Sequence, residues 1–524
     1  MKLFSECESR GFGFQRQTGA MHPKGALELR KLDHAESVRR DVSPTISQSR
    51  KSEFGQFMTP APVARFMASL FSTDAGSECR LLDAGAGVGA LSCAFLDRWV
   101  AGDIGFQTVE AFAYEIDDRL RDHLARHLSS YTGVVLHVIG NDFIEHATRG
   151  RLFSDSLPVV NGGAGFTHAI LNPPYKKINN SSSHRTALRS VGIETVNLYS
   201  GFVALAVEML APGGEIVAII PRSWCNGPYY RPFRDYIFAR VALRHIHLFE
   251  SRTTAFKDDG VLQENIIIHL QRGVSQGPVK ITTSTDDTFS DIAEHEHPFE
   301  RIVFPDDPER FVHVPTSSDW GAIELSTTIR SSLNDLGIKV STGPVVDFRL
   351  RNHLRPMPEP GAIPLLYSMH FSPAGLVWPQ PDMKKPNAIM RNSDTERWLF
   401  PNGFYCVVRR FSSKEERRRV VASVVDPSAF EGMAMLGFEN HLNVFHEGRR
   451  GLTQSLAHGL CAYLNTTAVD ESFRRFNGHT QVNATDLKLM KYPSRETLMA
   501  LGGWVLSAGI ISQDMLDEQL RKLG

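Results

Sequence analysis

The tetrapeptide Asn172-Pro173-Pro174-Tyr175 combines groups that suit a planar substrate carrying an amino group. It follows the apolar run 169–171, so we expect it to form a tight loop at the end of a buried strand. Proline fixes φ and has no backbone donor, so the loop carbonyls can accept from a ligand. Asn172 adds a side-chain acceptor and Tyr175 a flat aromatic face. Asn-Pro is also an ordinary turn signal, so the tetrapeptide alone leaves both interpretations open.

A glycine-rich turn lies upstream, after the expected strand 80–84. Its glycines, Gly85 and Gly87 among them, allow positive φ and a close approach of the backbone to a ligand. Such a turn alone is weak evidence, because dinucleotide-binding enzymes share it. Asp83, at the expected end of the strand, is less typical of those enzymes and could face a cationic cofactor or its ordered water.

Two further expected strand ends carry a carboxylate. Glu115 ends the second strand about 30 residues after the turn and suits a ribose diol. Asp142 and Phe143 follow the third strand, where they could bind the amino group and ring of an adenine. Each residue alone could be an ordinary polar strand end. In this order, with G-x-G-x-G in place of the dinucleotide pattern G-x-G-x-x-G, they predict a pocket for an adenosyl cofactor.

The ordered set resembles the γ group of amino-methylating DNA methyltransferases, which use S-adenosylmethionine. That group places the cofactor motifs first, then N-P-P-Y, then the target recognition domain. Residues 55–60, with the sequence GQFMTP, are similar to its N-terminal cofactor motif. The tract 255–267 and the stretch 476–487 resemble the PstI/BsuBI branch of type II modification methylases. The resemblance covers roughly residues 50–500, and the order of the motifs makes it specific.

The resemblance implies which residues would bind the methionine end of S-adenosylmethionine. Thr59 and Pro60 would contact the methionine moiety. Asp83 and the backbone of Gly85 and Gly87 would bound the same end of the pocket.

The resemblance also implies an adenosine end. Glu115 would take the ribose hydroxyls, and Ile116 would pack on the adenine. Asp142 would accept from the cofactor N6, with Phe143 alongside.

The target base would bind at the tetrapeptide. The resemblance implies that Asn172 and the Pro173 carbonyl hold the target amino group, with Pro174 in the same catalytic loop. Tyr175 and Phe256 would sandwich the flipped base. The predicted reaction is direct displacement at the sulfonium methyl group by the amino nitrogen, with proximity and orientation supplying most of the catalysis. It needs neither a covalent nucleophile nor a metal.

DNA contacts are expected from local clusters, because phosphate contacts fix position and a few side chains read base edges. Arginines gather in residues 222–252 and in residues 409–419. About half of these arginines are better interpreted as a solvated helix face. Asn477, His479 and Gln481 belong to a polar loop that would contact DNA or, alternatively, form a structural turn before the next helix.

The resemblance implies an adenine-specific DNA methyltransferase that modifies N6 in duplex DNA after base flipping. It would protect DNA in a restriction-modification system, with the cognate restriction endonuclease as a separate partner. The chemistry of the tetrapeptide serves adenine N6 and cytosine N4 equally, so the choice of adenine rests on the resemblance. The alternatives are methylation of RNA or of protein glutamine, and a non-catalytic DNA-specificity module.

The apolar runs divide the chain into parts. In residues 51–275 they alternate with helical stretches, which predicts an α/β, doubly wound parallel sheet of Rossmann-like methyltransferase type. Residues 276–310 are polar and interrupted by proline, which predicts a linker. Residues 311–500 predict an α+β target recognition domain, with helices at 413–424 and 451–465. The remaining segments are an N-terminal extension and a C-terminal helix, residues 1–50 and 501–524.

Composition limits the class of protein. Lys and Arg total 57 against 58 Asp and Glu, so a DNA-binding surface must come from local clustering. The 6 cysteines include no C-x-x-C pair, which predicts no zinc site and a reducing compartment. No apolar run approaches the ~18 residues of a membrane span. We therefore expect a cytoplasmic, nucleoid-associated bacterial protein that binds no metal and no membrane.

Overall fold

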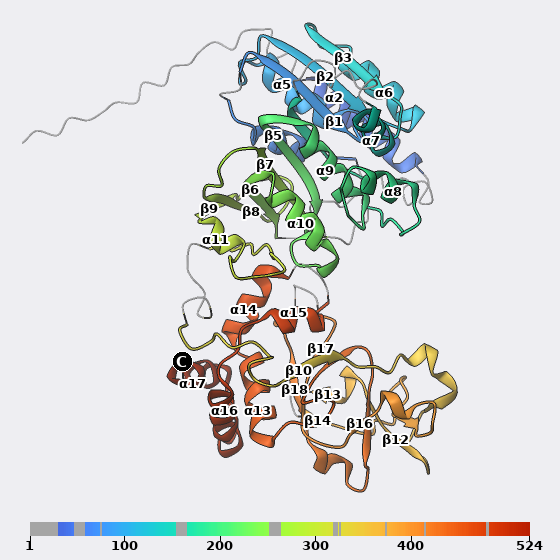
Figure 1. The fold of residues 1–524 in the computed structure, drawn as a ribbon, viewed down its shortest axis with the longest axis vertical. Helices are drawn as coiled ribbons and strands as arrows, with labels where there is room; N and C mark the ends of the chain where they lie inside the picture. Colours follow the sequence, from blue (N-terminus) through green and yellow to red (C-terminus); the bar gives the residue numbers. More distant parts are fainter. Residues whose placement is uncertain are drawn as a thin grey trace, which may run out of the picture.

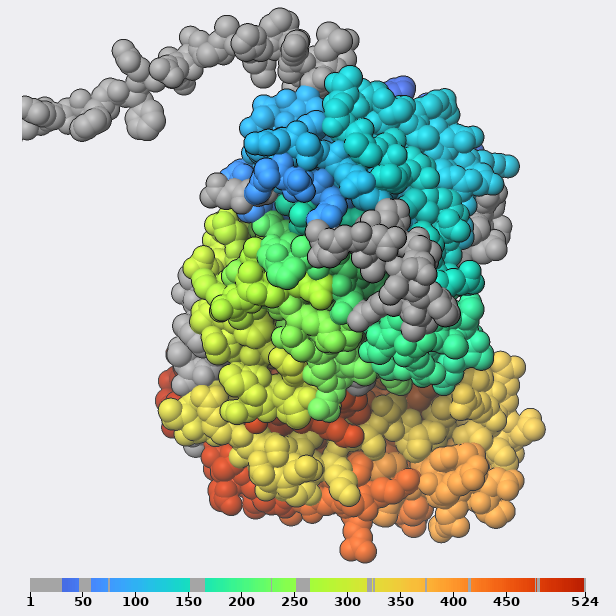
Figure 2. All heavy atoms as spheres, turned by 45° about the horizontal axis from the view of Figure 1, so that its top comes forward, coloured from blue at the N-terminus to red at the C-terminus, as the bar shows by residue number. Residues whose placement is uncertain are grey.

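The computed structural model is elongated, with two parts stacked along its long axis (Figure 1). The α/β part comprises the described residues up to 317, and the second part comprises those from 323 onward. The described residues are 30–46, 58–73, 76–153, 165–250, 264–317, 323, 326–372, 375–412, 416–477 and 481–523. Helices α14 and α15 lie where the two parts meet. In the space-filling view, the green middle of the chain lies next to the yellow-to-red second part, while the blue N-terminal elements lie away from it (Figure 2).

A nine-stranded sheet runs through the α/β part, in the order β3-β2-β1-β4-β5-β7-β6-β8-β9. Its strands are β1 (Glu78–Ala84), β2 (Thr108–Tyr114), β3 (Val134–Ile139), β4 (Phe166–Leu171), β5 (Leu210–Pro221), β6 (Val241–Phe249), β7 (Asn265–Arg272), β8 (Val279–Ser284) and β9 (Ala293–His297). β1 to β5 pair in parallel, whereas β7 lies antiparallel between β5 and β6. The sheet is therefore mixed, and the predicted parallel arrangement holds for its first five strands.

Helices cover both faces of this sheet. They are α2 (Arg30–Val42), α4 (Ala61–Ser69), α5 (Ala90–Val100), α6 (Asp118–Leu128), α7 (Phe143–Phe153), α8 (Ser183–Ser190), α9 (Leu198–Met209), α10 (Arg231–Phe238) and α11 (Phe299–Ile302). Successive strand residues point to opposite faces, so Leu82 packs in the core that contains α9, whereas Leu81 packs in the core that contains α4 and α5. This alternation confirms the predicted α/β class.

The segment predicted as a linker, residues 276–310, instead contains β8, β9 and α11. β8 pairs in parallel with β6 and antiparallel with β9. Val279 and Ile281 are fully buried, because two residues apart on a strand they face the same core. The prediction was wrong because this strand is short and its flanking glycine and proline dominate the local composition.

The second part contains three sheets, in the orders β10-β20-β17-β18, β11-β15-β12-β19-β16 and β13-β14. The first sheet comprises β10 (Lys339–Thr342), β17 (Tyr405–Arg409), β18 (Ala422–Val425) and β20 (Leu442–His446). The second comprises β11 (Leu354–Arg355), β12 (Ala362–Leu366), β15 (Ala388–Met390), β16 (Phe400–Pro401) and β19 (Met435–Phe438). The third pairs β13 (Phe371–Ser372) with β14 (Gly375–Leu376). The helices are α13 (Gln454–Leu464), α14 (Thr467–Phe476), α15 (Ala484–Leu489), α16 (Arg495–Ser507) and α17 (Gln513–Leu523).

The helix expected at 413–424 is also wrong for the residues that the structure describes. Residues 416–421 form no helix, and β18 follows them. Val420 and Val425 are fully buried, and β18 pairs antiparallel with β17. The charged residues at the start of the segment suit a helix, but its β-branched end is stabilised by packing against the sheet.

Each part has its own apolar cores. Among the described residues, the two clusters of the α/β part end at Val314, and the three clusters of the second part begin at Ile323. Within the second part, α13 and α16 approach each other through Gly459 and Gly502. A Cβ on Gly459 would lie 1.7 Å from the carbonyl oxygen of Leu498, so the two helix backbones touch. No described helix is long and apolar enough to cross a membrane.

Candidate active site

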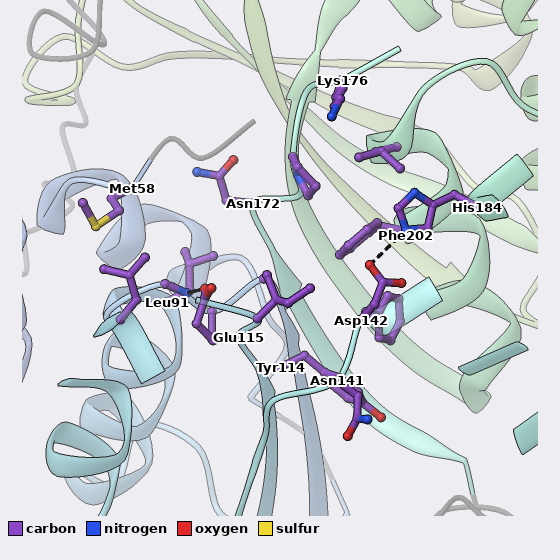
Figure 3. Close-up of a pocket in the computed structure, with 18 of the residues that line it drawn as sticks. Met58, Leu91, Tyr114, Glu115, Asn141, Asp142, Asn172, Lys176, His184 and Phe202 are labelled. Atoms are coloured by element: carbon purple, nitrogen blue, oxygen red, sulfur yellow. Dashed lines mark hydrogen bonds and ion pairs between the residues drawn. The ribbon is translucent and has the colours of Figure 1, made fainter. Parts of the chain in front are cut away.

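A cavity of about 420 Å³ opens at the carboxyl ends of four neighbouring strands (Figure 3). Its lining comes from the glycine-rich turn after β1, from residues 114–116 at the end of β2, from residues 141–143 after β3, and from Asn172 and Pro174 after β4. Parallel α/β sheets bind their ligands at this edge. The fold thus joins, in one cavity, the motifs that lie far apart in the sequence.

The glycine-rich turn brings backbone to the wall of the cavity. Gly85 and Gly87 have φ values of 84° and 58°, a region that L side chains rarely adopt. The amide of Gly85 donates to the carbonyl of Tyr114 over 3.0 Å, which ties the turn to β2. A Cβ on Gly85 would lie 3.7 Å from the Asn172 carbonyl, so a side chain there would enter the space between the turn and the tetrapeptide.

Asp83 is buried behind this wall and does not itself line the cavity. Its Oδ2 accepts from Ser92 Oγ over 2.6 Å, while its Oδ1 has no hydrogen-bond partner among the described residues. Burial raises the pKa of the Asp83 carboxyl to about 7, although the hydrogen bonds from Ser92 act in the opposite direction. An orphaned carboxylate oxygen in this position would be stabilised by a nearby cation.

Glu115 connects the glycine-rich turn to the end of β2. Its Oε2 accepts from the Gly87 amide and its Oε1 from the Asp117 amide, each over 2.8 Å. Burial raises the pKa of the Glu115 carboxyl, and the two amide hydrogen bonds counteract that rise. Ile116 beside it is 44% exposed, which is unusual for isoleucine and offers an apolar face within the cavity.

Asp142 is held by two contacts. Its Oδ1 accepts from the Glu145 amide over 2.9 Å at the start of α7, and its Oδ2 lies 3.0 Å from His184 Nε2 (Figure 3). Burial acts to raise the pKa of Asp142, but the backbone amides of Ile144 and Glu145 together with the hydrogen bond and charge of His184 outweigh burial, so the pKa is lowered. The same hydrogen bond raises the pKa of His184 against the effect of burial. Phe143 is buried, with its ring 5.1 Å from that of Tyr114.

Asn172 lies at the cavity with both ends of its amide engaged. Its Nδ2 donates to Thr59 Oγ1 over 2.9 Å, and its Oδ1 accepts from the Tyr175 hydroxyl over 3.1 Å. The Tyr175 hydroxyl also lies 3.2 Å from the Ile219 carbonyl on β5. Burial raises the pKa of Tyr175 far above neutrality, so the hydroxyl stays a donor. These contacts fix the amide plane of Asn172, whose oxygen carries two lone pairs.

The prolines predicted for the site differ in position. Pro174 lines the cavity, whereas Pro173 is buried and is not part of the lining. Pro60 is the N-cap of α4, and its carbonyl accepts from the Ala64 amide over 3.0 Å. The tetrapeptide therefore presents Asn172 and Pro174 to the cavity, with Pro60 setting the start of α4 next to it.

Asn477, which was expected to contact DNA, is buried inside the second part. Its Oδ1 accepts from Arg419 Nη2 over 3.2 Å, and its Nδ2 donates to Asp486 Oδ2 over 2.9 Å. The prediction that Asn477 contacts DNA is wrong, because Arg419 and Asp486 occupy both polar ends of its amide. Gln481 remains partly exposed, and its Oε1 lies 3.4 Å from Arg410 Nη2.

Two other residues predicted to bind the substrate, Phe256 and His479, lie outside the described residues. Three arginines of the two clusters match neither a phosphate contact nor the alternative of a solvated helix face. Arg222, Arg234 and Arg419 are buried and donate to groups of the protein, so they are not phosphate contacts.

The cavity also contains residues that the sequence did not single out. Lys176 and Lys177 follow the tetrapeptide directly, and this position was their only signal. Leu198 and Phe202 lie one turn apart on α9, so in the sequence they are indistinguishable from core residues. His184 lies in a serine-rich run that carries no motif.

The residues of the cavity fit an adenosyl cofactor with a cationic centre. The backbone of Gly85 leaves room for a close ligand, and the Glu115 carboxylate suits a diol. Ile116 and Phe202 offer apolar surface for a flat ring. Behind the wall of the cavity, the orphaned oxygen of Asp83 suits a positive charge near the glycine-rich turn. No cluster of metal ligands occurs among the described residues.

Comparison with known proteins gives consistent matches. The family model of the Eco57I restriction-modification methylase matches residues 115–256. The type II methyltransferase M.BsuBI of Bacillus subtilis is 50% identical over 496 residues, which are 94% of this chain and 98% of that protein. The type II methyltransferase M.PstI of Providencia stuartii is 40% identical over 494 residues, 92% of this chain and 95% of that protein.

Among solved structures, the fold is similar to the type IIL restriction-modification enzyme MmeI in complex with DNA. The TM-score is 0.48 at 11% identity, over 95% of this chain and 73% of that one.

Proposed function

Since the chain belongs to the type II DNA methyltransferases of restriction-modification systems, which use S-adenosylmethionine, we propose that it methylates N6 of an adenine in duplex DNA. The observation that carries the proposal is the amide of Asn172, oriented by Thr59 and Tyr175 at the edge of a cavity suited to the cofactor. An oriented amide oxygen is what an exocyclic amino group needs as an acceptor.

The positions of residues in the cavity support the binding roles that the family resemblance implies. We assign Glu115 to the ribose hydroxyls, Ile116 and Phe202 to the faces of the cofactor adenine, and Asp142 to its amino group. The glycine-rich turn and Thr59 would bound the methionine end. We propose that the Asp83 carboxylate acts across the glycine-rich turn on the positive sulfonium of the cofactor. His184 already donates to Asp142, so the Asp142 carboxylate would bind the cofactor in a fixed orientation.

S-adenosylmethionine supplies an electrophilic methyl group. The amino nitrogen of the target base is a poor nucleophile, because its lone pair is delocalised into the ring. Asn172 Oδ1 and the Pro173 carbonyl would accept its two N–H groups and so favour a pyramidal nitrogen. Thr59 and Tyr175 keep the Asn172 amide from rotating, so the orientation is set before substrate binds. Such preorganisation supplies catalysis through proximity rather than through a covalent intermediate.

The same contacts would serve cytosine N4. We propose adenine because the motif order and the tracts around 255–267 and 476–487 resemble the PstI/BsuBI branch. A stacked adenine cannot reach a cavity at a sheet edge, so the base must leave the helix, with the loss of stacking offset in part by aromatic contacts. We also propose that a separate endonuclease cleaves the same DNA sequence when it is unmethylated.

Asn172→Ala tests this function. We expect methyl transfer to duplex DNA to fall by about 100-fold or more, because the amino group loses its oriented acceptor, while the cofactor binds as before. The measurements are single-turnover methylation and calorimetric titration with S-adenosylmethionine. Asn180→Ala is the control, since Asn180 is exposed in the same loop and does not line the cavity. Near-normal turnover of Asn172→Ala would refute the assignment.

The base and its sequence context need a second experiment. DNA from a host that expresses the chain should carry one methylated motif when it is sequenced by a method that detects modified bases. A methyl group at adenine N6 in that motif supports the proposal. A methyl group at cytosine N4 would overturn the choice of base and leave the role of Asn172 intact.

A further inference from the structure

Arg222 joins the two parts of the molecule. It lies in η2 (Arg222–Trp224), which follows β5 directly, and it is buried. Its Nη1 donates to Glu264 Oε1 over 2.9 Å within the α/β part. Its Nη2 donates to the carbonyls of Arg474 and Arg475, over 3.2 Å and 2.9 Å, in the last turn of α14. One guanidinium therefore bonds to both parts.

The end of α14 is a suitable partner for a cation. The last carbonyls of a helix have no partner within the helix and carry its negative dipole end. The Arg475 carbonyl also accepts from the Val314 amide over 2.9 Å, so this point of α14 is bonded twice to the chain leading out of the α/β part. Helices α14 and α15 lie where the two parts meet in Figure 1.

η2 also connects to the tetrapeptide 172–175, through Ser223 and Tyr199. Ser223 Oγ and the Tyr199 hydroxyl share a hydrogen bond of 3.1 Å, and the Tyr199 ring lies 6.2 Å from that of Tyr175, edge to face. Tyr175 also bonds to the carbonyl of Ile219 on β5, three residues before Arg222. Two separate contacts thus run from Tyr175 to the segment that holds α14.

The chemistry of Arg222 makes the contact specific. A guanidinium donates in fixed directions, so it can serve a carboxylate and two carbonyls at once, which an ammonium cannot do in the same geometry. Loss of one partner of a buried pair leaves the other charge uncompensated. The contact between α14 and the α/β part therefore depends on both Arg222 and Glu264.

We propose that Arg222 is a positioning residue that couples the second part, as the DNA-recognising part, to Tyr175 at the target base. This inference rests on the proposed role of the tetrapeptide. Arg222 does not line the cofactor cavity. Its loss should therefore slow methyl transfer from the bound complex without weakening cofactor binding.

The test compares Arg222→Lys and Arg222→Met with wild type, using the full chain and an unmethylated duplex that carries the motif it modifies. We expect the single-turnover rate at saturating DNA to fall about tenfold or more, because a small misplacement of reacting groups slows reaction steeply. The dissociation constants for the cofactor and for DNA should stay within about threefold. Glu264→Gln should give the same pattern.

Arg272→Lys is the matched control. Arg272 also caps a helix, since it donates to carbonyls at the end of α9 and pairs with Glu208, but all these contacts lie within the α/β part. We expect it to lower the melting temperature without a selective loss of the single-turnover rate.

Three results would overturn the proposal: an unchanged rate in Arg222→Lys and Glu264→Gln, a rate loss that cofactor affinity accounts for, or an equal loss in Arg272→Lys. If the Arg222 variants do not fold, Glu264→Gln decides alone. The readout is methyl transfer to whichever base wild type modifies, so an error in the adenine assignment would not be mistaken for failure of the coupling.

Discussion

Glu115→Gln tests the cofactor pocket sharply, although the two side chains have the same shape. Glu115 uses one oxygen for the Gly87 amide and the other for the Asp117 amide. Glutamine has one oxygen and one NH₂ group, so it can accept from only one of these amides. The other buried amide would then face a donor. The substitution therefore disturbs the glycine-rich turn as well as the proposed acceptor for the ribose.

The expected magnitude follows from these bonds. Hydrogen bonds to a charged group contribute about 1 kcal/mol more than neutral ones, so two ribose hydroxyls would lose about 2 kcal/mol. Displacement of the Gly87 amide adds up to about 1 kcal/mol, within the range for an unsatisfied buried donor. A total of about 2–3 kcal/mol raises the dissociation constant of S-adenosylmethionine about 30- to 160-fold.

The assay is calorimetric titration of the purified variant with S-adenosylmethionine, with a thermal melt to show that the variant is folded. Glu110→Gln is the control, because Glu110 lies on β2, the strand that leads to Glu115, but it pairs with His137 over 2.9 Å and does not line the cavity. The reasoning fails if Glu115→Gln binds within threefold of wild type. It fails equally if Glu110→Gln loses as much affinity.

Two other predictions concern stability. Gly459→Ala should destabilise the second part by at least about 1–3 kcal/mol in a denaturant titration, because the new Cβ would overlap the Leu498 carbonyl; Gly503→Ala, with open space around its Cβ, should not, and equal melting of the two variants would contradict the close approach of α13 and α16. Because the pKa of Asp142 is lowered in the folded protein, Asp142 stabilises the fold above its unfolded-state pKa, and this stabilisation is lost in acid. Because the pKa of His184 is raised, His184 stabilises the fold below its unfolded-state pKa, and this stabilisation is lost as the pH rises through its folded-state pKa. His184→Gln should therefore lower the melting temperature more at pH 6 than at pH 8.5, and a pH-independent difference would argue against the ion pair.

Much of the cavity could be predicted because its residues lie at strand ends. An apolar run followed by Asp, Glu or Asn marks the point where a buried strand reaches its ligand-binding edge, and Glu115, Asp142 and Asn172 all line the cavity. The Rossmann-like sheet was predictable for the same reason, since each strand of its parallel half is a distinct apolar run between helices.

What the sequence could not supply is which polar side chains are consumed inside the protein. Asn477 and Arg222 resemble DNA contacts when composition alone is considered, yet both are buried against partners far away in the chain. His184 reaches Asp142 only because α8 packs beside α7, and no local pattern encodes that contact. The strand β8 was missed because its pairing with β6 is a tertiary contact.

The separation of the apolar cores has an evolutionary consequence. Substitutions that repack one side of the boundary between Val314 and Ile323 do not change the packing on the other side. The second part, which we propose recognises DNA, can therefore change its packing while the packing around the cofactor cavity stays the same. Among the described residues, the contacts that bridge the boundary, such as that of Arg222 with the end of α14, are the positions where such divergence would be most constrained.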